Sequence, residues 1–339
     1  MPPTATWTKI CESDALRRSS QTLAVVDGAT YIFGGELRPR EPVESSVYRI
    51  PPRQNAEIDL VSPASADSLP EARVGATSTA LHGKIYVFSG RGGVAMAPIE
   101  ENGAFWVFDT MSETWSQLLP KDPAGPRPAG RSYHATTNDG QHTIFIHAGC
   151  PEKGRLSDLW AFNIVEGTWR ELPAAPAPDR GGTSIAYAQG KLYRMNGFDG
   201  KTEQGGALDV FDLDSNSWQT VKFDPDGSQG PGARSVSCLL SVVVDDQPGL
   251  VTLFGEHDPS SLGHQGAGKM LDDVWMFDIQ SRKWEELKFP EDSEIPCPRG
   301  WFDADVAGDT EVVIHGGLAE SNRRLGDAWL LNLGPGTQS

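Results

Sequence analysis

One short stretch of the sequence concentrates side chains that could do acid–base or metal chemistry. It reads LFGEHDPSSLGHQGAGK (253–269) and contains Glu256, His257, Asp258 and His264. A carboxylate and an imidazole over one pocket can act as general base and general acid, or can bind a metal ion together. The stretch is rich in Gly, Ser and Pro, which predicts a loop. The elements around this loop must therefore decide where its side chains point.

Those elements belong to a repeat that runs along the whole chain. Five tryptophan phrases recur: TWTKI (6–10), TWSQL (114–118), TWREL (168–172), SWQTV (217–221) and KWEEL (283–287). Six apolar segments end in small residues: YIFGG (31–35), YVFSG (86–90), FIHAG (145–149), YRMNG (193–197), TLFGE (252–256) and VIHGG (313–317). A period of about 50 residues with four alternating segments is typical of one propeller blade. The predicted fold is all-β, a single six-bladed propeller over residues 1–339.

The order of the phrases predicts how the ring closes. The blades open near arginines 18, 73, 131, 180, 234 and 299, and the sixth unit stops before a tryptophan phrase of its own. The first phrase, around Trp7, precedes every blade. We therefore expect residues 1–10 to form the outer strand of blade six, which leaves no broken sheet edge. In blade one, Ile58 is predicted to hold the tryptophan position.

The six blade-opening arginines are the main candidates for ligand binding. Each precedes an innermost strand, so we expect them to converge on one mouth of the channel, where guanidinium groups would bind an oxyanion through paired hydrogen bonds. The candidates are Arg18, Arg73, Arg131, Arg180, Arg234 and Arg299, with His134, Trp301 and Glu36 as possible neighbours. The alternative is that each arginine is a structural salt-bridge partner; Asp14, Glu71 and Asp179 lie near some of them.

The small strand ends, the aromatic of the next strand and the following tryptophan make the chain resemble the kelch family. Its blade-five loop, EHDPSSLGHQGAGKMLDDVWMFD (256–278), is similar to that of the plant specifier proteins, which are six-bladed kelch propellers. That resemblance implies Fe(II) bound by a Glu-x-x-x-Asp-x-x-x-His motif, and a sulfated aglycone steered toward nitriles, epithionitriles or thiocyanates. It also implies anion contacts from Arg73 and Arg131.

The motif is matched at its first and last positions, Glu256 and His264, whereas Ser260 stands where the family has Asp. A serine hydroxyl is a poor ligand for a divalent metal, so Asp258 is the other candidate for a third ligand, with His257 in reserve. Metal binding, metal-free pocket chemistry with Glu256, His264 and Asp258, and a purely structural loop all remain open.

Composition limits the range of partners and locations. The chain has 29 Lys and Arg against 46 Asp and Glu, a formal charge of −17, which disfavours nucleic acids and anionic membranes. No apolar run approaches the roughly 18 residues that span a bilayer. The N-terminal sequence lacks the pattern of a secretory signal. Four widely spaced cysteines suit free thiols, so a cytoplasmic location is expected.

Two classes of function follow from these observations. The first is a small-molecule enzyme or specifier-like protein, of lyase or isomerase type, acting on an anionic metabolite by metal-assisted or acid–base elimination or rearrangement. The second is a protein-interaction module without catalysis, a frequent use of kelch repeats. A sugar or sialic-acid isomerase is a third possibility that no particular residue selects.

Overall fold

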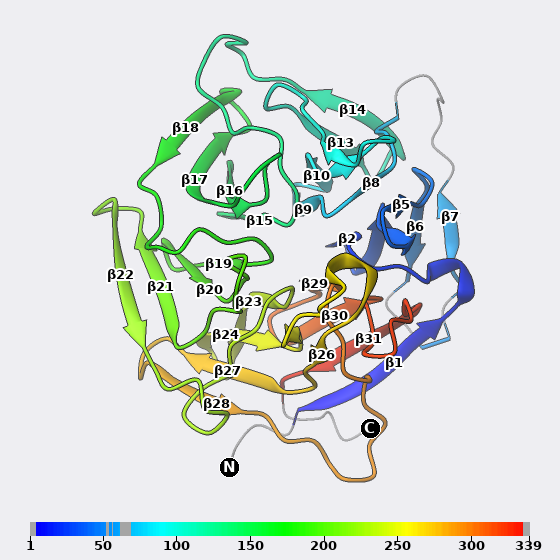
Figure 1. Cartoon of the computed structure of the whole chain (residues 1–339), viewed down its shortest axis with the longest axis vertical. Helices are drawn as coiled ribbons and strands as arrows, with labels where there is room; N and C mark the ends of the chain where they lie inside the picture. Colours follow the sequence, from blue (N-terminus) through cyan, green and yellow to red (C-terminus); the bar gives the residue numbers. More distant parts are fainter. Residues whose placement is uncertain (1–4, 52–53, 56, 62–68, 335–339) are drawn as a thin grey trace.

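The computed structural model describes residues 5–51, 54–55, 57–61 and 69–334. Figure 1 shows six four-stranded antiparallel sheets arranged around a common centre, which we number as blades one to six in chain order. The predicted all-β kelch-type architecture is confirmed. Within the described ranges, no helix is long and apolar enough to cross a membrane.

Each blade has four strands, which follow one another from the centre of the propeller outward. Blade one contains β2 (Thr22–Val26), β3 (Ala29–Phe33), β6 (Val47–Ile50) and β7 (Asp59–Val61). Blade two contains β9 (Thr77–Leu81), β10 (Lys84–Phe88), β13 (Phe105–Asp109) and β14 (Thr114–Leu118). Blade three contains β15 (Ala135–Asn138), β16 (Thr143–Gly149), β17 (Leu156–Asn163) and β18 (Thr168–Leu172).

The second half of the chain repeats this plan. Blade four contains β19 (Ser184–Ala188), β20 (Lys191–Met195), β21 (Ala207–Asp212) and β22 (Ser217–Lys222). Blade five contains β23 (Cys238–Val244), β24 (Gln247–Leu253), β27 (Val274–Asp278) and β28 (Lys283–Glu286). Blade six contains β29 (Asp303–Val306), β30 (Glu311–His315), β31 (Asp327–Asn332) and β1 (Thr6–Glu12).

Short elements decorate the loops between the blade strands. They are β4 (Glu36–Arg38), β5 (Glu41–Pro42), β8 (Arg73–Val74), β11 (Arg91–Gly92), β12 (Ala97–Pro98), β25 (Glu256–His257) and β26 (Lys269–Met270). Two 3₁₀ turns, η1 (Asp14–Leu16) and η2 (Gly263–Gln265), complete the set.

The N-terminal strand completes blade six, as the phrase order predicted. β1 pairs antiparallel with β31, and Trp7 lies opposite Leu331. The Trp7 ring is buried and stacks on Phe254 of blade five, with ring centroids 5.8 Å apart. Residues 1–4 of the predicted strand lie outside the described residues. The two ends of the chain therefore share one sheet, which joins the last blade to the first part of the sequence.

The repeated tryptophans pack between blades. Trp115 of blade two contacts Phe33 of blade one, with centroids 5.0 Å apart, and Trp169 of blade three contacts Phe88 of blade two at 5.8 Å. Such aromatic wedges bury large apolar areas and add favourable edge-on contacts. Ile58, directly before β7, packs against the apolar cluster of blades one and six, in keeping with its predicted place in the repeat.

A closed cycle of backbone hydrogen bonds joins the six blades at the start of their innermost strands. In each blade the residue two positions after the opening arginine donates its N–H to the carbonyl of the equivalent residue in the preceding blade, at 2.7 to 3.1 Å. These residues are Ser20, Gly75, Tyr133, Gly182, Val236 and Trp301, and all six have positive φ. Four of them are not glycine, so the cycle holds their backbones in a conformation that ordinary residues rarely adopt. We call this cycle the axial ring.

Candidate functional site

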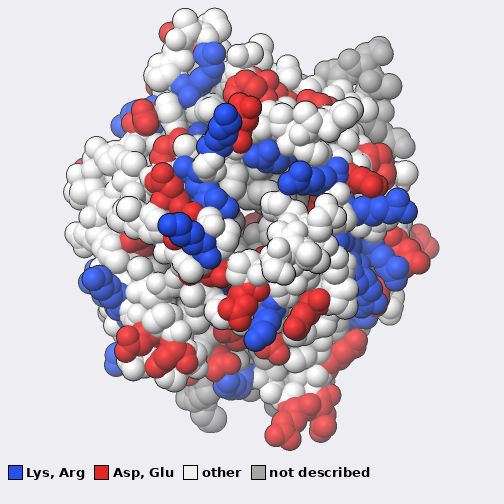
Figure 2. Space-filling model, in the orientation of Figure 1, with Lys and Arg blue, Asp and Glu red and all other residues white. Residues whose placement is uncertain are grey.

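The blade-five loop covers a cavity on one face of the axial ring. This cavity, which we call the mouth pocket, has a volume of about 420 Å³. Tyr133, Val236 and Trp301 of the axial ring form part of its lining, and Ser260 and His264 of the loop also line it. Figure 1 shows the loop between β25 and β26 lying over the centre of the propeller, and Figure 2 shows Lys and Arg side chains gathered beside the central hollow of the same face.

One position of the repeat supplies most of the pocket wall. It is the residue that follows the strand-end pair, and in each blade it forms a β-bridge back to the segment after the opening arginine. The six residues are Glu36, Arg91, Cys150, Phe198, Glu256 and Leu318. All except Leu318 line the mouth pocket. The strand-end pair of blade five is therefore Phe254–Gly255, and the segment TLFGE (252–256), which the sequence analysis aligned with the other strand ends, extends one residue beyond that pair.

Glu256 is held rigidly in the pocket wall. Its backbone exchanges two hydrogen bonds with Ser235, and its Oε1 accepts one from the Gly268 N–H at 2.7 Å. The residue is 5% exposed. Burial raises the pKa of the Glu256 carboxyl, and the nearby Glu203 carboxylate raises it further. Glu256 can therefore hold a proton at a higher pH than a surface glutamate.

His264 packs against the two aromatic residues of the axial ring. Its imidazole stacks on Tyr133 with centroids 6.0 Å apart and meets Trp301 edge-on at 5.5 Å. Burial lowers the pKa of His264, and the guanidinium groups of Arg40, Arg91 and Arg155 lower it further. The imidazole is therefore neutral over a wider pH range than an exposed histidine. The loop places His264 and Glu256 in the same pocket, as predicted.

These three arginines form the basic side of the mouth pocket. Arg91 donates to the Ser132 hydroxyl and to the Met96 and Pro151 carbonyls at 2.8 to 2.9 Å. Arg155 lies over the Phe198 ring, 5.0 Å from its centroid, and its Nε is buried without a hydrogen-bond partner in the described structure. Within the described ranges, none of the three guanidiniums pairs with a carboxylate side chain. Their positive charge remains available to an anionic ligand.

The blade-opening arginines, in contrast, do not line the mouth pocket. Each of the six is at most 5% exposed. In blade three, Arg131 makes a two-pronged ion pair with Asp158 at 2.6 and 2.9 Å, and Asp158 also accepts the Trp160 indole N–H. The same arrangement joins Arg73, Glu101 and Trp106; Arg234, Asp273 and Trp275; and Arg299, Asp327 and Trp329.

Blades one and four lack this carboxylate and use other contacts. Arg18 lies over the Tyr48 ring, 4.8 Å from its centroid, and donates to the Gly34 carbonyl at 3.2 Å. Arg180 donates to the Asn196 and Pro178 carbonyls. The predicted ring of six arginines around an open mouth is thus not observed, because each guanidinium is used inside its own blade. The structure lends no geometric support to anion binding by Arg73 or Arg131.

The remaining predicted residues divide between the pocket and its surroundings. Trp301 and Ser260 line the mouth pocket, whereas Asp258 does not. The Asp258 side chain is 60% exposed and lies 3.3 Å from His257 and 3.6 Å from Lys269. His134 does not line the mouth pocket. It is buried with its imidazole edge-on to Phe88, and it lines a second cavity, described below.

The predicted Fe(II) site needs three ligands that converge on one point. Within the described residues, no group of three His, Cys, Asp or Glu side chains is arranged to hold a metal ion. Ser260 Oγ accepts the Leu262 N–H, and Asp258 points to solvent. The donors present therefore do not fit a three-ligand iron site, and Fe(II) binding stays a prediction.

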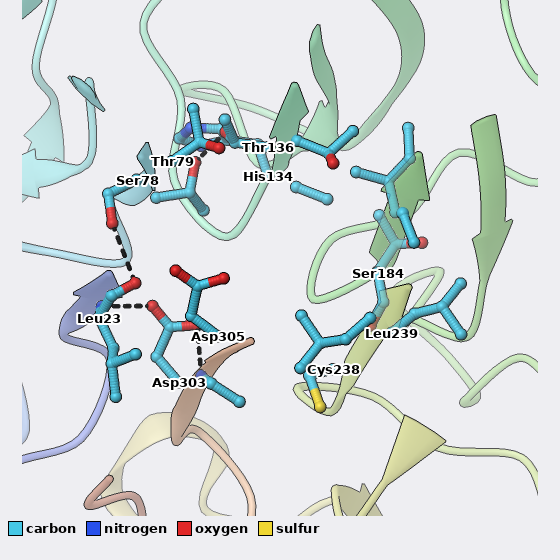
Figure 3. Close-up of a pocket in the computed structure, with 18 of the residues that line it drawn as sticks. Leu23, Ser78, Thr79, His134, Thr136, Ser184, Cys238, Leu239, Asp303 and Asp305 are labelled. Carbon is cyan, nitrogen blue, oxygen red and sulfur yellow. Dashed lines mark hydrogen bonds between the residues drawn. The ribbon is translucent and has the colours of Figure 1, made fainter. Parts of the chain in front are cut away.

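A second cavity, which we call the axial cavity, lies between the innermost strands and also measures about 420 Å³. It shares Tyr133, Gly182, Val236 and Trp301 with the mouth pocket. Figure 3 shows Asp303 and Asp305 of β29 beside Leu23 of β2. Asp303 accepts the Leu23 N–H at 2.6 Å, and Asp305 accepts the Val25 N–H at 2.8 Å. These carboxyls link blade six to blade one.

Comparison with known proteins assigns the repeat. The family described as "KLHDC2/KLHL20/DRC7 Kelch-repeats domain" matches residues 20–255. The chain belongs to the kelch-repeat family. A solved structure titled "Structure of YjhT" aligns with a TM-score of 0.69, covering 95% of this kelch chain and 96% of the other at 15% identity, and so supports the fold.

Among curated relatives, the "N-(sulfonatooxy)prop-2-enimidothioate sulfolyase" of Thlaspi arvense is 28% identical over 349 residues, covering 94% of both chains. This similarity confirms the specifier-type resemblance over nearly the whole kelch chain. The "Leucine-zipper-like transcriptional regulator 1 homolog" of Drosophila melanogaster is 22% identical. The alignment covers 95% of this chain but only 32% of that protein.

Sequence reasoning missed the most telling pocket residues. Arg91 occupies the same repeat position as Glu256, so aligning the blades on their strand-end pairs would have found it. Arg155 and Glu203 lie in turns of blades three and four that the repeat does not specify. No spacing in the sequence shows that these two turns face the same cavity.

Proposed function

We propose that this kelch protein acts on a small organic molecule that carries an anionic, sulfate-like group, bound in the mouth pocket. The observation that carries the proposal is the set of three pocket arginines that have no carboxylate partner among the described residues and share the pocket with Glu256 and His264. Guanidinium groups match sulfate and similar oxyanions through paired hydrogen bonds. Their position beside a buried carboxyl and a neutral imidazole suits a reaction in which negative charge develops on a leaving group.

The name of the Thlaspi relative indicates the class of reaction, loss of a sulfonatooxy group. In this chain, Arg91 and Arg155 would bind the leaving group and stabilise its charge as the bond breaks. Glu256 would accept or hold a proton, and His264 would serve as a neutral hydrogen-bonding partner. The ring faces of Tyr133 and Trp301 would exclude water from the apolar part of the ligand. Both elimination and rearrangement of the organic fragment are compatible with these roles.

Binding and turnover can be tested separately. The probe is N-(sulfonatooxy)prop-2-enimidothioate, the compound in the name of the Thlaspi relative. We expect Arg155→Ala to weaken binding of this sulfated probe by about ten-fold or more, because a guanidinium of the pocket lining is lost. Glu256→Gln should instead lower the turnover rate by about 100-fold while binding is retained. The matched control is Arg38→Ala, since Arg38 is exposed near the pocket without lining it.

Unchanged binding in Arg155→Ala would contradict the proposed anion site. The same assay with Fe(II), and then with a chelator, tests the metal prediction independently. Activity that depends on Fe(II) would require ligands beyond Glu256 and His264. A cytoplasmic location remains part of the proposal; the four cysteines form no disulfide in the described structure.

A protein partner is the second candidate function. Three exposed apolar side chains stand on loops that also line the mouth pocket: Leu37, Val94 and Leu262, at 50%, 108% and 69% exposure. Exposed apolar residues around a concave site are typical of interaction surfaces. If partner binding is the function, Val94→Asp with Leu262→Asp should abolish it, whereas Glu256→Gln should leave it intact.

A further inference from the structure

We propose that Arg324 is a positioning residue that holds two loops of the mouth pocket in place at once. The inference rests on the proposed function, because one of these loops carries Arg40 and the other carries His264, and both residues line the pocket. Arg324 comes from the turn between β30 and β31 of blade six. Its side chain is 5% exposed and is not part of the pocket lining, so it acts through the residues that it holds.

The backbone of Arg324 is fixed to the rest of blade six. Arg324 forms a β-bridge with Leu318, and Leu318 forms another with Gly300, which directly precedes the axial-ring residue of that blade. The next residue, Leu325, donates its N–H to the Gly317 carbonyl at 2.9 Å. The side chain of Arg324 therefore extends from a rigid base.

One arm of the guanidinium reaches the turn of blade one between β4 and β5. Arg324 Nη2 donates to Glu36 Oε1 at 3.0 Å, and Glu36 Oε2 accepts the Arg40 N–H at 2.7 Å. Arg40 has a φ of 62°, a conformation that residues other than glycine rarely adopt. The Glu36 carboxylate therefore closes a strained turn, and Arg324 holds that carboxylate. Together they fix the backbone that carries the Arg40 side chain.

The other arm reaches the loop of blade five through Asn322. Arg324 Nη1 donates to the backbone and side-chain oxygens of Asn322 at 3.4 and 3.3 Å, and the Asn322 amide donates to the Gln265 carbonyl at 3.0 Å. Gln265 belongs to η2, next to His264. Among the described residues, this is the one hydrogen bond that joins segment 259–267 to another blade.

The shape of the guanidinium explains how one side chain can hold both loops. Its planar fork presents five N–H donors in fixed directions, whereas a lysine ammonium is a compact point charge. Arg324 Nε also donates to the Ser19 hydroxyl at 3.3 Å, so all three nitrogens bind atoms of the fold. Arg40, in contrast, is one of the pocket arginines that can meet an anion. A small displacement of such a group is enough to weaken its action on a ligand.

Hydrogen–deuterium exchange of the whole protein tests both arms without a ligand. In Arg324→Met, we expect peptides spanning residues 36–42 and 259–268 to exchange about ten-fold faster, the effect of one lost hydrogen bond to a charged group. Arg324→Lys should restore slow exchange in 36–42, because an ammonium can still pair with Glu36, and leave 259–268 fast. The matched control is Arg323→Met, the neighbouring exposed arginine, which should leave both segments unchanged.

Asn322→Gly separates the two arms. Asn322 is exposed and has a φ of 62°, so glycine keeps the backbone conformation and removes only the side-chain amide. We expect faster exchange in 259–268 and wild-type exchange in 36–42. If Arg324→Met does not fold, Asn322→Gly and Arg324→Lys carry the test, and protection of 259–268 in both variants would overturn the proposal. Thermal unfolding verifies that each variant is folded.

Binding of the sulfated probe connects this arrangement to the site. Arg324→Met should weaken binding by about ten-fold, and by less than about three-fold when Arg40→Ala is already present, because the first arm acts through Arg40. Equal losses in the two backgrounds, or wild-type exchange of 36–42 in folded Arg324→Met, would overturn the proposal. Exchange as expected, with no binding of the probe to wild type, would count against the proposed function alone.

Discussion

The mouth pocket and the axial cavity are equal in volume and share residues of the axial ring, yet their linings differ in kind. Three arginines line the mouth pocket, whereas the described lining of the axial cavity includes no Lys or Arg. In the axial cavity, polar side chains reach across to the neighbouring innermost strand: Asn138 donates to Thr79, and Asp303 accepts the Leu23 N–H. Both linings also contain buried polar atoms without a hydrogen-bond partner among the described residues. They include Arg155 Nε and Glu203 Oε1 in the mouth pocket, and Ser20 Oγ, Gln21 Oε1 and both ring nitrogens of His134 in the axial cavity.

This difference separates polar groups that hold the propeller together from groups that can bind a ligand. Blade-to-blade hydrogen bonds satisfy donors and acceptors within the fold, and their net contribution is to stability. Buried polar atoms without partners cost stability, so their presence calls for another explanation. In the mouth pocket, at the loop end of the axial ring, such atoms include those of two ionisable side chains, Arg155 and Glu203, whereas in the axial cavity they include those of Ser20, Gln21 and His134. We place the function at the loop end because its lining also carries the three arginines.

The largest effect should come from an arginine that belongs to the fold rather than to the pocket. Arg131→Met removes a buried guanidinium and leaves the partly buried Asp158 carboxylate without its ion-pair partner, and we expect a loss of about 3 kcal/mol in the free energy of unfolding. Arg155→Met, at the pocket, should change that free energy by less than about 1 kcal/mol. Urea unfolding of both variants measures the contrast. Similar losses in the two variants would erase the distinction between structural and pocket arginines.

A pH-dependent effect should come from the axial cavity. Burial raises the pKa of Asp303 from 3.8 to about 7, so the folded protein favours its neutral form. The corresponding stabilisation is complete below pH 3.8 and is lost as the pH rises to about 7. Asp303→Asn keeps an acceptor for the Leu23 N–H and removes the titration.

We therefore expect Asp303→Asn to flatten the fall in stability between pH 4 and 7, by on the order of 2 kcal/mol. Thermal unfolding across this range measures the change. Asp305→Asn should act in the same direction over a narrower range, since the pKa of Asp305 is raised to about 6. Identical pH profiles for wild type and Asp303→Asn would show that the pKa of this carboxyl is not raised.

The smallest effect is expected at Asp258, which the sequence places among the site residues. Because its side chain is 60% exposed, Asp258→Asn should change the free energy of unfolding by less than about 0.5 kcal/mol and leave probe binding unchanged. Isothermal titration with the sulfated probe provides the measurement. A clear loss of affinity would show that Asp258 takes part in ligand binding and would again make it a candidate third metal ligand.

Much of the fold could be predicted because the same residue types recur at corresponding positions of each blade. The Trp phrases and small strand ends mark every blade, and the missing sixth phrase correctly predicted that β1 completes blade six. For the site, Glu256, Ser260 and His264 of the blade-five loop line one cavity together with Trp301, and their roles in it stay a prediction. The prediction that the six blade-opening arginines face the mouth of the channel was not met, for a physical reason. Regular spacing locates a residue along a strand but does not give the direction of its side chain or the position of its carboxylate partner.

The sequence by itself determined the number of blades, the joining of the chain ends and the long loop of blade five. The recurring phrases give the number of blades, the absence of a sixth tryptophan phrase gives the joining of the ends, and the interruption of the strand pattern gives the loop. Only the tertiary structure decided which charges remain unpaired. Arg131 meets Asp158, 27 residues later, inside its blade, whereas Arg91, Arg155 and Glu203 come together from three blades around one cavity. Pairing of charges is a property of distance in space, and no local pattern encodes it.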